Sequence, residues 1–144
     1  RVIDNFMIQG GDIENMRGSG GYSAHYYGFC NGEQVPESEC RQKEDYNIPG
    51  EHENGLKHVA GALAAAHAGL NTDGSQFYIL PSDGSAAHLD WEPGKTCLGG
   101  STDSCHTVFG YVISGMEHVD AISNLETQND SPVDPVRIIS ARIA

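Results

Sequence analysis

Short apolar runs separated by polar, glycine-rich loops are the dominant pattern along the chain. Two such runs open it, at residues 1–3 and 6–9, and three more follow at 63–66, 77–80 and 107–112. Runs of this length bounded by Gly, Asn and Asp are typical of β-strands. The pattern therefore predicts a mainly β protein in which short strands are joined by turns and long loops.

The stretch 63–80 is the one around which the other runs are organised. Small residues lead into a loop of glycine, asparagine and aspartate, which leads into Phe-Tyr-Ile-Leu. Three consecutive alanines favour a helix, but the segment between Gly61 and Gly69 is shorter than a marginal helix. We therefore predict a strand, a tight loop and a strand. Small residues on the first strand would let a ligand chain lie directly against it.

Four further segments complete the outline. Residues 13–54 and 91–105 are polar and are predicted to be long loops, which are usually functional or held by cross-links. Apolar residues within 116–125 recur at the spacing of one helix face, so we expect a helix there. Apolar alternation at 136–143 predicts a last strand.

Composition limits the classes of partner. A chain of 144 residues is one domain with a real core, and 18 glycines fit many short elements joined by turns. Eight Lys and Arg against 20 Asp and Glu give a formal charge of −12, which opposes binding to nucleic acid or to anionic membranes. No apolar run is long enough to span a membrane. The charge itself is ordinary for a domain kept soluble by repulsion.

The four cysteines fall into two local pairs, Cys30 with Cys40 and Cys97 with Cys105. An even count with local pairing predicts two disulfides and therefore an extracellular, periplasmic or cell-surface protein. Each short loop closed by a bridge would gain about 2–3 kcal/mol of stability. Zinc is the less favoured alternative, because neither pair has the C-x₂₋₄-C spacing of a zinc site. Reduced thiols in a cytoplasmic protein are the other alternative.

Five blocks in order resemble the successive signatures of the cyclophilins, the peptidyl-prolyl cis/trans isomerases. They are Phe-Met-Ile-Gln-Gly-Gly-Asp at 6–12, Gly-x-Asn-Thr-x-Gly-Ser-Gln-Phe-Tyr-Ile at 69–79, His-Leu-Asp at 88–90, His-Thr-Val-Phe-Gly at 106–110 and Gly-Met at 115–116. The resemblance runs the length of the chain. It implies one isomerase domain over 1–144, built as a closed antiparallel barrel of about eight strands capped by helices, with two inserted loops stapled by the disulfides.

The family's first two strands and first helix would precede Arg1. A barrel without them would expose unpaired strand edges, which invite aggregation. We therefore expect upstream residues in the natural protein, or a separate segment or larger assembly that completes the barrel.

The activity that the resemblance implies is rotation about X-Pro bonds, which assists the folding of proline-containing clients. The uncatalysed rotation takes tens of seconds or more because amide resonance must be broken. Catalysis needs an apolar pocket for the proline ring, donors for the flanking backbone and a group that favours the twisted amide. No cofactor or metal is required.

The resemblance assigns roles residue by residue. Arg1 matches the catalytic cation. Its positive charge would stabilise the lone pair that appears on the prolyl nitrogen as the amide twists. By itself, a terminal arginine would be read as simply solvated. The other matches are Phe6, Gln9 and His106 for catalysis, and Met7, Ala66, His67, Ala68, Gln76, Tyr78, His88 and Leu89 for substrate binding. In this set Gln9 and Gln76 form a polar pair beside the arginine, and His67 would contribute backbone groups more than its ring. Phe6 and Met7 could equally be ordinary barrel residues.

Several residues depart from the family pattern. Tyr78 replaces a common phenylalanine, and its hydroxyl needs water or a partner, while His67 replaces a common asparagine. His88 stands where cyclosporin-sensitive members carry tryptophan, which implies weak cyclosporin binding. The insertion 91–105 places a stapled loop beside His106, where it could shape substrate choice.

Two functions remain open at this point. The chain is either an active isomerase for extracellular or cell-surface clients, or a non-catalytic binding or structural module that keeps the scaffold within a larger assembly. The retained set of pocket residues favours the isomerase.

Overall fold

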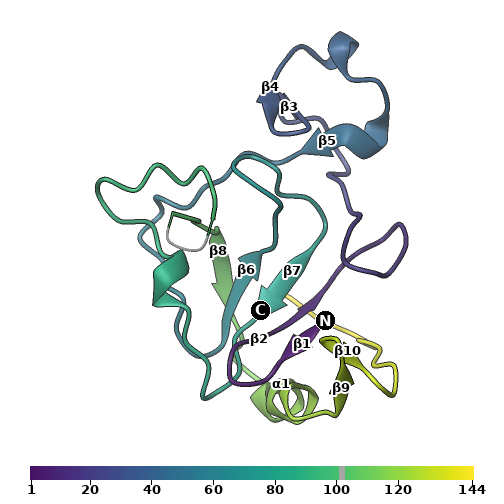
Figure 1. Ribbon diagram of the computed structural model, residues 1–144, viewed down its shortest axis with the longest axis vertical. Helices are drawn as coiled ribbons and strands as arrows, with labels where there is room; N and C mark the ends of the chain where they lie inside the picture. The colour runs from purple at the N-terminus through teal and green to yellow at the C-terminus, as the bar shows by residue number, and fades with distance from the viewer. Residues whose placement is uncertain (101–102) are drawn as a thin grey trace.

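The computed structural model describes residues 1–100 and 103–144 and is dominated by a five-stranded sheet (Figure 1). Its strands are β1 (Val2–Ile3), β2 (Met7–Gly10), β7 (Phe77–Ile79), β6 (Ala62–Ala65) and β8 (Val108–Tyr111), in that spatial order. Every pair is antiparallel. Each of the five apolar runs thus contains a strand, as predicted, and the five strands form one sheet.

Strands β6 and β7 confirm the strand, loop and strand predicted over 63–80. Ala64 lies opposite Tyr78, and Ala65 opposite Phe77. The other edge of β6 pairs with β8. The alanine run is therefore extended because hydrogen-bonded neighbours on both sides outweigh its helix propensity, which is only a weak preference.

A tight turn joins β1 to β2 and fixes which residues face the site. The N–H of Phe6 donates to the carbonyl of Ile3 at 3.1 Å, and Asn5 adopts a left-handed conformation with φ 56°. Because Phe6 belongs to the turn rather than to the strand, Phe6 and Met7 pack against the same apolar cluster. The alternation of strand faces begins only at Ile8, which joins a second cluster.

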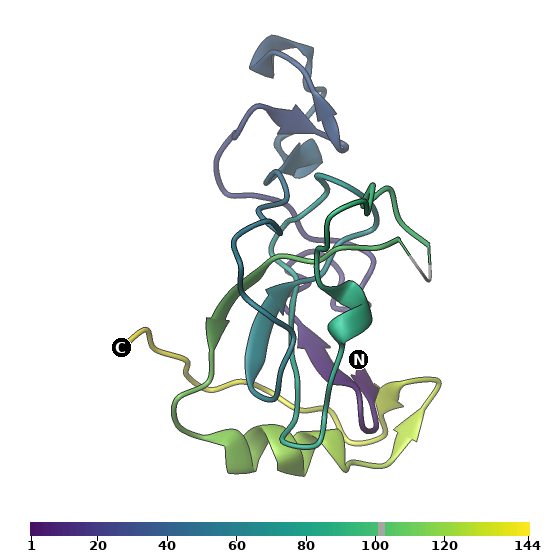
Figure 2. The same cartoon turned by 90° about the vertical axis from the view of Figure 1, so that its left-hand side faces the viewer.

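The two apolar clusters cover different residues of the same strands. The first contains Met7, Ala62, Ala64, Tyr78, Leu80, Ala86, Leu89 and Val108. The second contains Val2, Ile8 and Val119, with Ile79, Met116 and Ile122 against them. Helix α1 (Met116–Ser123) supplies Met116, Val119 and Ile122 to this second cluster and lies across the lower end of β1 and β2 (Figures 1 and 2). The predicted helix is confirmed, but it ends before Leu125, which is 37% exposed.

A small second sheet stands apart from the main one (Figures 1 and 2). It consists of β4 (Glu33–Gln34), β3 (Phe29–Cys30) and β5 (Tyr46–Asn47), with 3₁₀ turns at Glu37–Glu39 and Lys43–Asp45. The Cys30–Cys40 disulfide closes this lobe, with 5.9 Å between its Cα atoms. The Cys97–Cys105 disulfide closes the second insertion, with 5.0 Å between its Cα atoms. Both predicted pairings are confirmed.

The end of the chain corrects one prediction. Residues 136–143 form no strand and are exposed, with Ile139 94% and Ile143 104% accessible. An alternating segment forms a strand only where a neighbouring strand can pair with it through hydrogen bonds. This segment has no such neighbour among the described residues. The last pairing before it is the hairpin of β9 (Thr127–Gln128) and β10 (Ser131–Pro132).

Two further features bear on the predicted architecture. Within residues 1–100 and 103–144 the five strands form an open row, and no pairing of β1 with β8 closes a barrel. The same residues include no helix that is both long and apolar enough to cross a bilayer.

Candidate active site

An apolar cluster forms where β2, β7 and the 3₁₀ turn Ala87–Leu89 meet. Met7, Tyr78 and Leu89 are only 3%, 4% and 8% exposed, and Phe6 packs against them. The sequence places these four residues in three separate blocks, and the fold brings them into one cluster.

His106 packs its ring against this cluster. Its ring meets that of Tyr78 edge-on, with centroids 5.6 Å apart and planes at 76°. Nδ1 lies 2.9 Å from the carbonyl of Ala65, and Nε2 lies 3.2 Å from the hydroxyl of Ser104. A carbonyl only accepts, so Nδ1 carries the proton and Nε2 accepts from Ser104. Burial lowers the pKa of His106 to about 4, with His67 contributing in the same direction, so the ring is neutral at physiological pH.

His67 lies flat on His106. The two ring centroids are 3.9 Å apart, and the planes differ by 15°. Nε2 of His67 donates to the carbonyl of Cys105 at 2.7 Å, while Nδ1 accepts from the N–H of Gly69 at 3.1 Å. His67 was expected to contribute backbone groups more than its ring, yet the ring also stacks on His106 and ties the loop after β6 to the disulfide of the second insertion.

A buried polar chain stands behind the pocket. The hydroxyl of Tyr78 donates to Nε2 of His58 at 2.7 Å, and Nδ1 of His58 donates to Asp90 at 2.8 Å. Burial opposes the charge of Asp90, but the backbone N–H and ring of His58 more than compensate, so the pKa of Asp90 is lowered. Burial lowers the pKa of His58, which is therefore a neutral acceptor for Tyr78.

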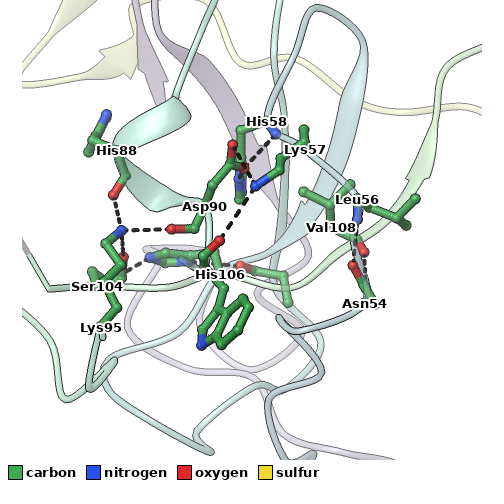
Figure 3. A network of polar contacts seen from close by, with 12 residues as sticks. Asn54, Leu56, Lys57, His58, His88, Asp90, Lys95, Ser104, His106 and Val108 are labelled. Carbon is green, nitrogen blue, oxygen red and sulfur yellow. Dashed lines mark hydrogen bonds and ion pairs between the residues drawn. The ribbon is translucent and has the colours of Figure 1, made fainter. Parts of the chain in front are cut away.

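Lys95, in the second insertion, fastens the edge of the pocket (Figure 3). Its ammonium group donates to the carbonyls of His88 at 2.6 Å and Asp90 at 2.7 Å, and reaches that of Ser104 at 3.4 Å. One side chain thus joins the turn that carries Leu89 to the segment that carries His106. Three carbonyls around one ammonium group make a charge-assisted clamp.

The polar side of the site consists of glutamine side chains. Nε2 of Gln9 donates to Oε1 of Gln76 at 2.8 Å, and Nε2 of Gln76 donates to the carbonyl of Gly20 at 2.6 Å. The predicted polar pair is therefore in contact. The backbone of Gln9 also lies beside that of Arg1, since the N–H of Gln9 donates to the carbonyl of Arg1 at 2.8 Å.

The guanidinium of Arg1 lies on Asp130. Nε and Nη2 of the guanidinium donate to the same oxygen of Asp130 at 3.2 and 3.0 Å. The side chains of Arg1 and Asp130 are 51% and 47% exposed. Asp130 belongs to the turn between β9 and β10. The backbone of Arg1 thus lies beside Gln9, whereas its guanidinium group contacts the β9–β10 hairpin.

A cavity of about 390 Å³ borders the polar side. Its lining includes Gln9 and Gln76 as well as Ala66, His67 and Ala68, which were predicted to receive the substrate backbone. Two carboxylates, Glu14 and Glu44, come from the first long loop. The remaining predicted residue, His88, is exposed, and its ring stacks on Phe6 with centroids 5.9 Å apart.

Six residues described here were not among the predicted site residues, namely His58, Asp90, Lys95, Ser104, Glu14 and Glu44. For His58 the sequence held one signal, the hydroxyl of Tyr78, which needs a hydrogen-bond partner but does not indicate which residue provides it. Among the described residues, one group of His, Cys, Asp or Glu side chains is spaced to hold a metal, and it consists of His52, Cys97 and Cys105 rather than of pocket residues.

Comparison with known proteins gives consistent matches. The family model described as "Cyclophilin type peptidyl-prolyl cis-trans isomerase/CLD" matches residues 1–143. The chain is 37% identical to peptidyl-prolyl cis-trans isomerase cypE of Dictyostelium discoideum, over 98% of this chain and 69% of that protein. It is 37% identical to peptidyl-prolyl cis-trans isomerase-like 1 of Aspergillus fumigatus, over 99% and 68%. A rhodopsin-specific isozyme of Calliphora vicina is 35% identical, over 97% and 46%.

Proposed function

The chain belongs to the cyclophilin-type peptidyl-prolyl cis-trans isomerases, and from this premise we propose that the pocket around Tyr78 and His106 is where it isomerises X-Pro bonds. The observation that supports the proposal is that Met7, Tyr78 and Leu89 belong to one apolar cluster, with His106 against Tyr78 and Gln9 of the glutamine pair opposite Tyr78 on the neighbouring strand. The proline ring would occupy that surface, and the flanking backbone would follow Ala66, His67 and Ala68.

The chemical step requires a cation near the prolyl nitrogen. As the amide twists, conjugation is lost and the nitrogen gains a lone pair, so a positive group there favours the transition state over the planar ground state. Arg1 is the residue we assign to this role. Its exposed pair with Asp130 is worth at most about 1 kcal/mol, so the guanidinium can leave that carboxylate for a bound peptide at little cost.

Neutral histidine suits the other side of the pocket. A charged His106 would resist burial against the proline ring, whereas the neutral ring held by Ala65 and Ser104 presents a fixed, weakly polar wall. Phe6 and Gln9 complete the proposed catalytic set, with Gln9 held in place by Gln76. His88 offers a smaller ring than tryptophan at the rim, and weak cyclosporin binding stays a prediction.

The finer architecture and location are part of the same proposal. We propose a closed antiparallel barrel, which family membership and the antiparallel row of five strands support. The two disulfides are compatible with an oxidising compartment, and we propose an extracellular, periplasmic or cell-surface location on that basis. Clients would be proteins with accessible proline-containing segments.

The acidic cavity suggests a substrate preference. Glu14 and Glu44 line the space into which a residue flanking the proline would project, and the chain as a whole carries a formal charge of −12. A peptide with Lys or Arg next to the X-Pro bond would therefore be attracted, and one with Glu repelled.

The test is an isomerisation assay on a proline-containing peptide, monitored by exchange NMR so that no coupling protease is needed. Arg1→Ala should lower kcat/KM by about tenfold or more, equivalent to about 1.4 kcal/mol of lost transition-state stabilisation. Arg17→Ala changes another exposed arginine outside the pocket and should leave the rate unchanged. Equal rates for both variants would remove Arg1 from the mechanism.

One observation favours the alternative of a non-catalytic binding module, namely the contact of the Arg1 guanidinium with Asp130. Under this alternative the peptide would bind the pocket without faster exchange. Saturable peptide binding that is abolished by His106→Ala, with no acceleration at any protein concentration, would establish it.

A further inference from the structure

A histidine from a distant part of the sequence lies beside one of the disulfides. One ring nitrogen of His52 and the sulfur atoms of Cys97 and Cys105 all lie within 4.8 Å of one another. Both cysteines are 2% exposed, and His52 is half-buried. The chain therefore holds two buried sulfurs beside a half-buried imidazole nitrogen.

Space and additional ligands adjoin this group. A cavity of about 330 Å³ is lined by residues 50–54, which include His52 between Glu51 and Glu53. Both glutamates are exposed. An ion bound at His52 would thus have a carboxylate or a water molecule within reach as a further ligand, and an open path from solvent.

We propose that reduction of the Cys97–Cys105 disulfide converts this group into a zinc site, with two thiolates and the His52 imidazole as ligands. Zn²⁺ favours Cys and His in a tetrahedral set of four, and the fourth position would be taken by water or by a neighbouring glutamate. The three ligands are not among the residues that we propose for X-Pro isomerisation.

The conversion balances with a dithiol as the reductant. The dithiol supplies two electrons and two protons, the sulfur–sulfur bond of the protein breaks, and the dithiol itself becomes a disulfide. Zinc then binds the two thiol groups as thiolates and releases both protons to solvent. Each sulfur serves either in the disulfide or on the metal, so the two states exclude each other.

The rearrangement needed is small. Bonded sulfur atoms lie about 2.0 Å apart, whereas two thiolates on one tetrahedral zinc, with Zn–S near 2.3 Å, lie about 3.8 Å apart. The Cα atoms of Cys97 and Cys105 are 5.0 Å apart, and Gly99 and Gly100 both follow Cys97 with positive φ. Glycine tolerates backbone change, so side-chain rotation with a small loop shift would suffice.

The position of the site connects it to the pocket. Cys105 immediately precedes His106, and its carbonyl accepts the hydrogen bond of His67. Either cross-link, disulfide or zinc, would hold this segment in place, whereas a reduced chain without metal would lack both. The zinc form therefore belongs to a chain that has not yet been oxidised or that resides in a reducing compartment.

The other disulfide supplies an internal control. Among the described residues no histidine or carboxylate group of this spacing accompanies Cys30 and Cys40. A protein with Cys30→Ser and Cys40→Ser should therefore keep the zinc site, and one with Cys97→Ser and Cys105→Ser should lose it.

The experiment uses the full chain, reduced with a dithiol that is then removed under anaerobic conditions. Titration with Co²⁺ should give one equivalent bound, with the thiolate charge-transfer absorption of a tetrahedral site, and Zn²⁺ should displace it. His52→Gln should weaken binding by at least about tenfold, since even residues that only support a ligand contribute that much. The oxidised chain should bind neither ion at the same concentrations.

Three results would overturn the proposal. They are the absence of thiolate absorption in the reduced chain, unchanged affinity in His52→Gln, and equal binding by the Cys97→Ser, Cys105→Ser protein. Circular dichroism of each variant, together with native mass spectrometry of the unmodified reduced chain, separates loss of the site from loss of the fold.

Discussion

The hydroxyl of Tyr78 donates a hydrogen bond of 2.7 Å to Nε2 of His58, and the two rings lie almost parallel, with planes 13° apart and centroids 5.9 Å apart. The ring of Tyr78 packs in the apolar cluster and against His106, and its hydroxyl reaches His58. The hydroxyl that distinguishes tyrosine from phenylalanine is thus hydrogen-bonded inside the protein, and this bond fixes the position of the ring.

Replacing this hydroxyl should affect stability more than activity. In Tyr78→Phe the ring keeps its apolar contacts, but Nε2 of His58 is left buried without a donor, which costs about 1–3 kcal/mol. Urea denaturation would measure that loss, and kcat/KM should stay within about threefold of the unmodified protein. Tyr27→Phe, at an exposed tyrosine, is the matched control and should change neither quantity.

Removing the partner of Arg1 should favour catalysis. In Asp130→Asn the guanidinium no longer has a carboxylate to leave, and because an exposed pair is worth at most about 1 kcal/mol, kcat/KM should rise by up to about fivefold. Asparagine accepts the left-handed conformation of this residue, whose φ is 61°. Asp134→Asn changes an exposed acidic residue nearby and should have no effect. A fall in kcat/KM would show that Asp130 assists Arg1 instead of restraining it.

The lowered pKa of His106 should make the protein less stable in acid. The unfolded histidine takes up its proton near pH 6.5, whereas burial and His67 hold the folded pKa at about 4. Between these values the unfolded state binds more protons, so the free energy of unfolding should be greatest above pH 6.5 and fall as the pH drops toward 4. Denaturation midpoints across this range would measure the slope.

Two histidine variants identify the source of that slope. His106→Gln should flatten the curve between pH 6.5 and 4, while His58, which burial shifts in the same direction, keeps part of it. His118→Gln, at a side chain that is 82% exposed, should leave the curve unchanged. NMR titration of the His106 ring should find it neutral throughout the range above pH 5.

Loss of the Lys95 clamp should weaken substrate binding. Lys95→Met keeps the length of the side chain but removes the donor to His88, Asp90 and Ser104. The turn carrying Leu89 would then be held to the segment carrying His106 by the backbone hydrogen bond of 3.1 Å from the N–H of His106 to the carbonyl of Leu89, and its position should be less fixed. We expect KM to rise by about threefold to tenfold with a smaller change in kcat. Lys95→Arg restores the charge and the donors and should recover most of the affinity. Lys43→Met, at an exposed lysine of the small lobe, is the control.

The acidic cavity should distinguish charged peptides. A peptide with Lys beside the X-Pro bond should have a lower KM than its Glu counterpart, and Glu44→Gln should narrow the difference by about twofold to fivefold, the range of an exposed charge pair. The preference should diminish as salt rises, because exposed charges are screened. Glu39→Gln, on the same lobe but outside the cavity lining, should not alter it.

Local sequence patterns were enough to predict the elements whose formation depends on residues close together in the chain. The strand, loop and strand over 63–80, the two short disulfide loops and the start of the helix at Met116 all follow from residues a few positions apart. Ordered family motifs supplied the fold class and the set of residues that we propose for the pocket. The same local rules predicted a strand at 136–143 that does not form, because alternation cannot supply the neighbouring strand that a ladder requires.

Only the tertiary structure decided which distant side chains meet. No spacing in the sequence relates Tyr78 to His58, His67 to His106, Arg1 to Asp130, or His52 to the Cys97–Cys105 pair. These contacts form because antiparallel pairing and two cross-linked loops bring segments remote in the chain to one place. Hydrogen bonds and ring contacts act over a few ångströms, so their partners are fixed by where the folded backbone passes and not by residue order.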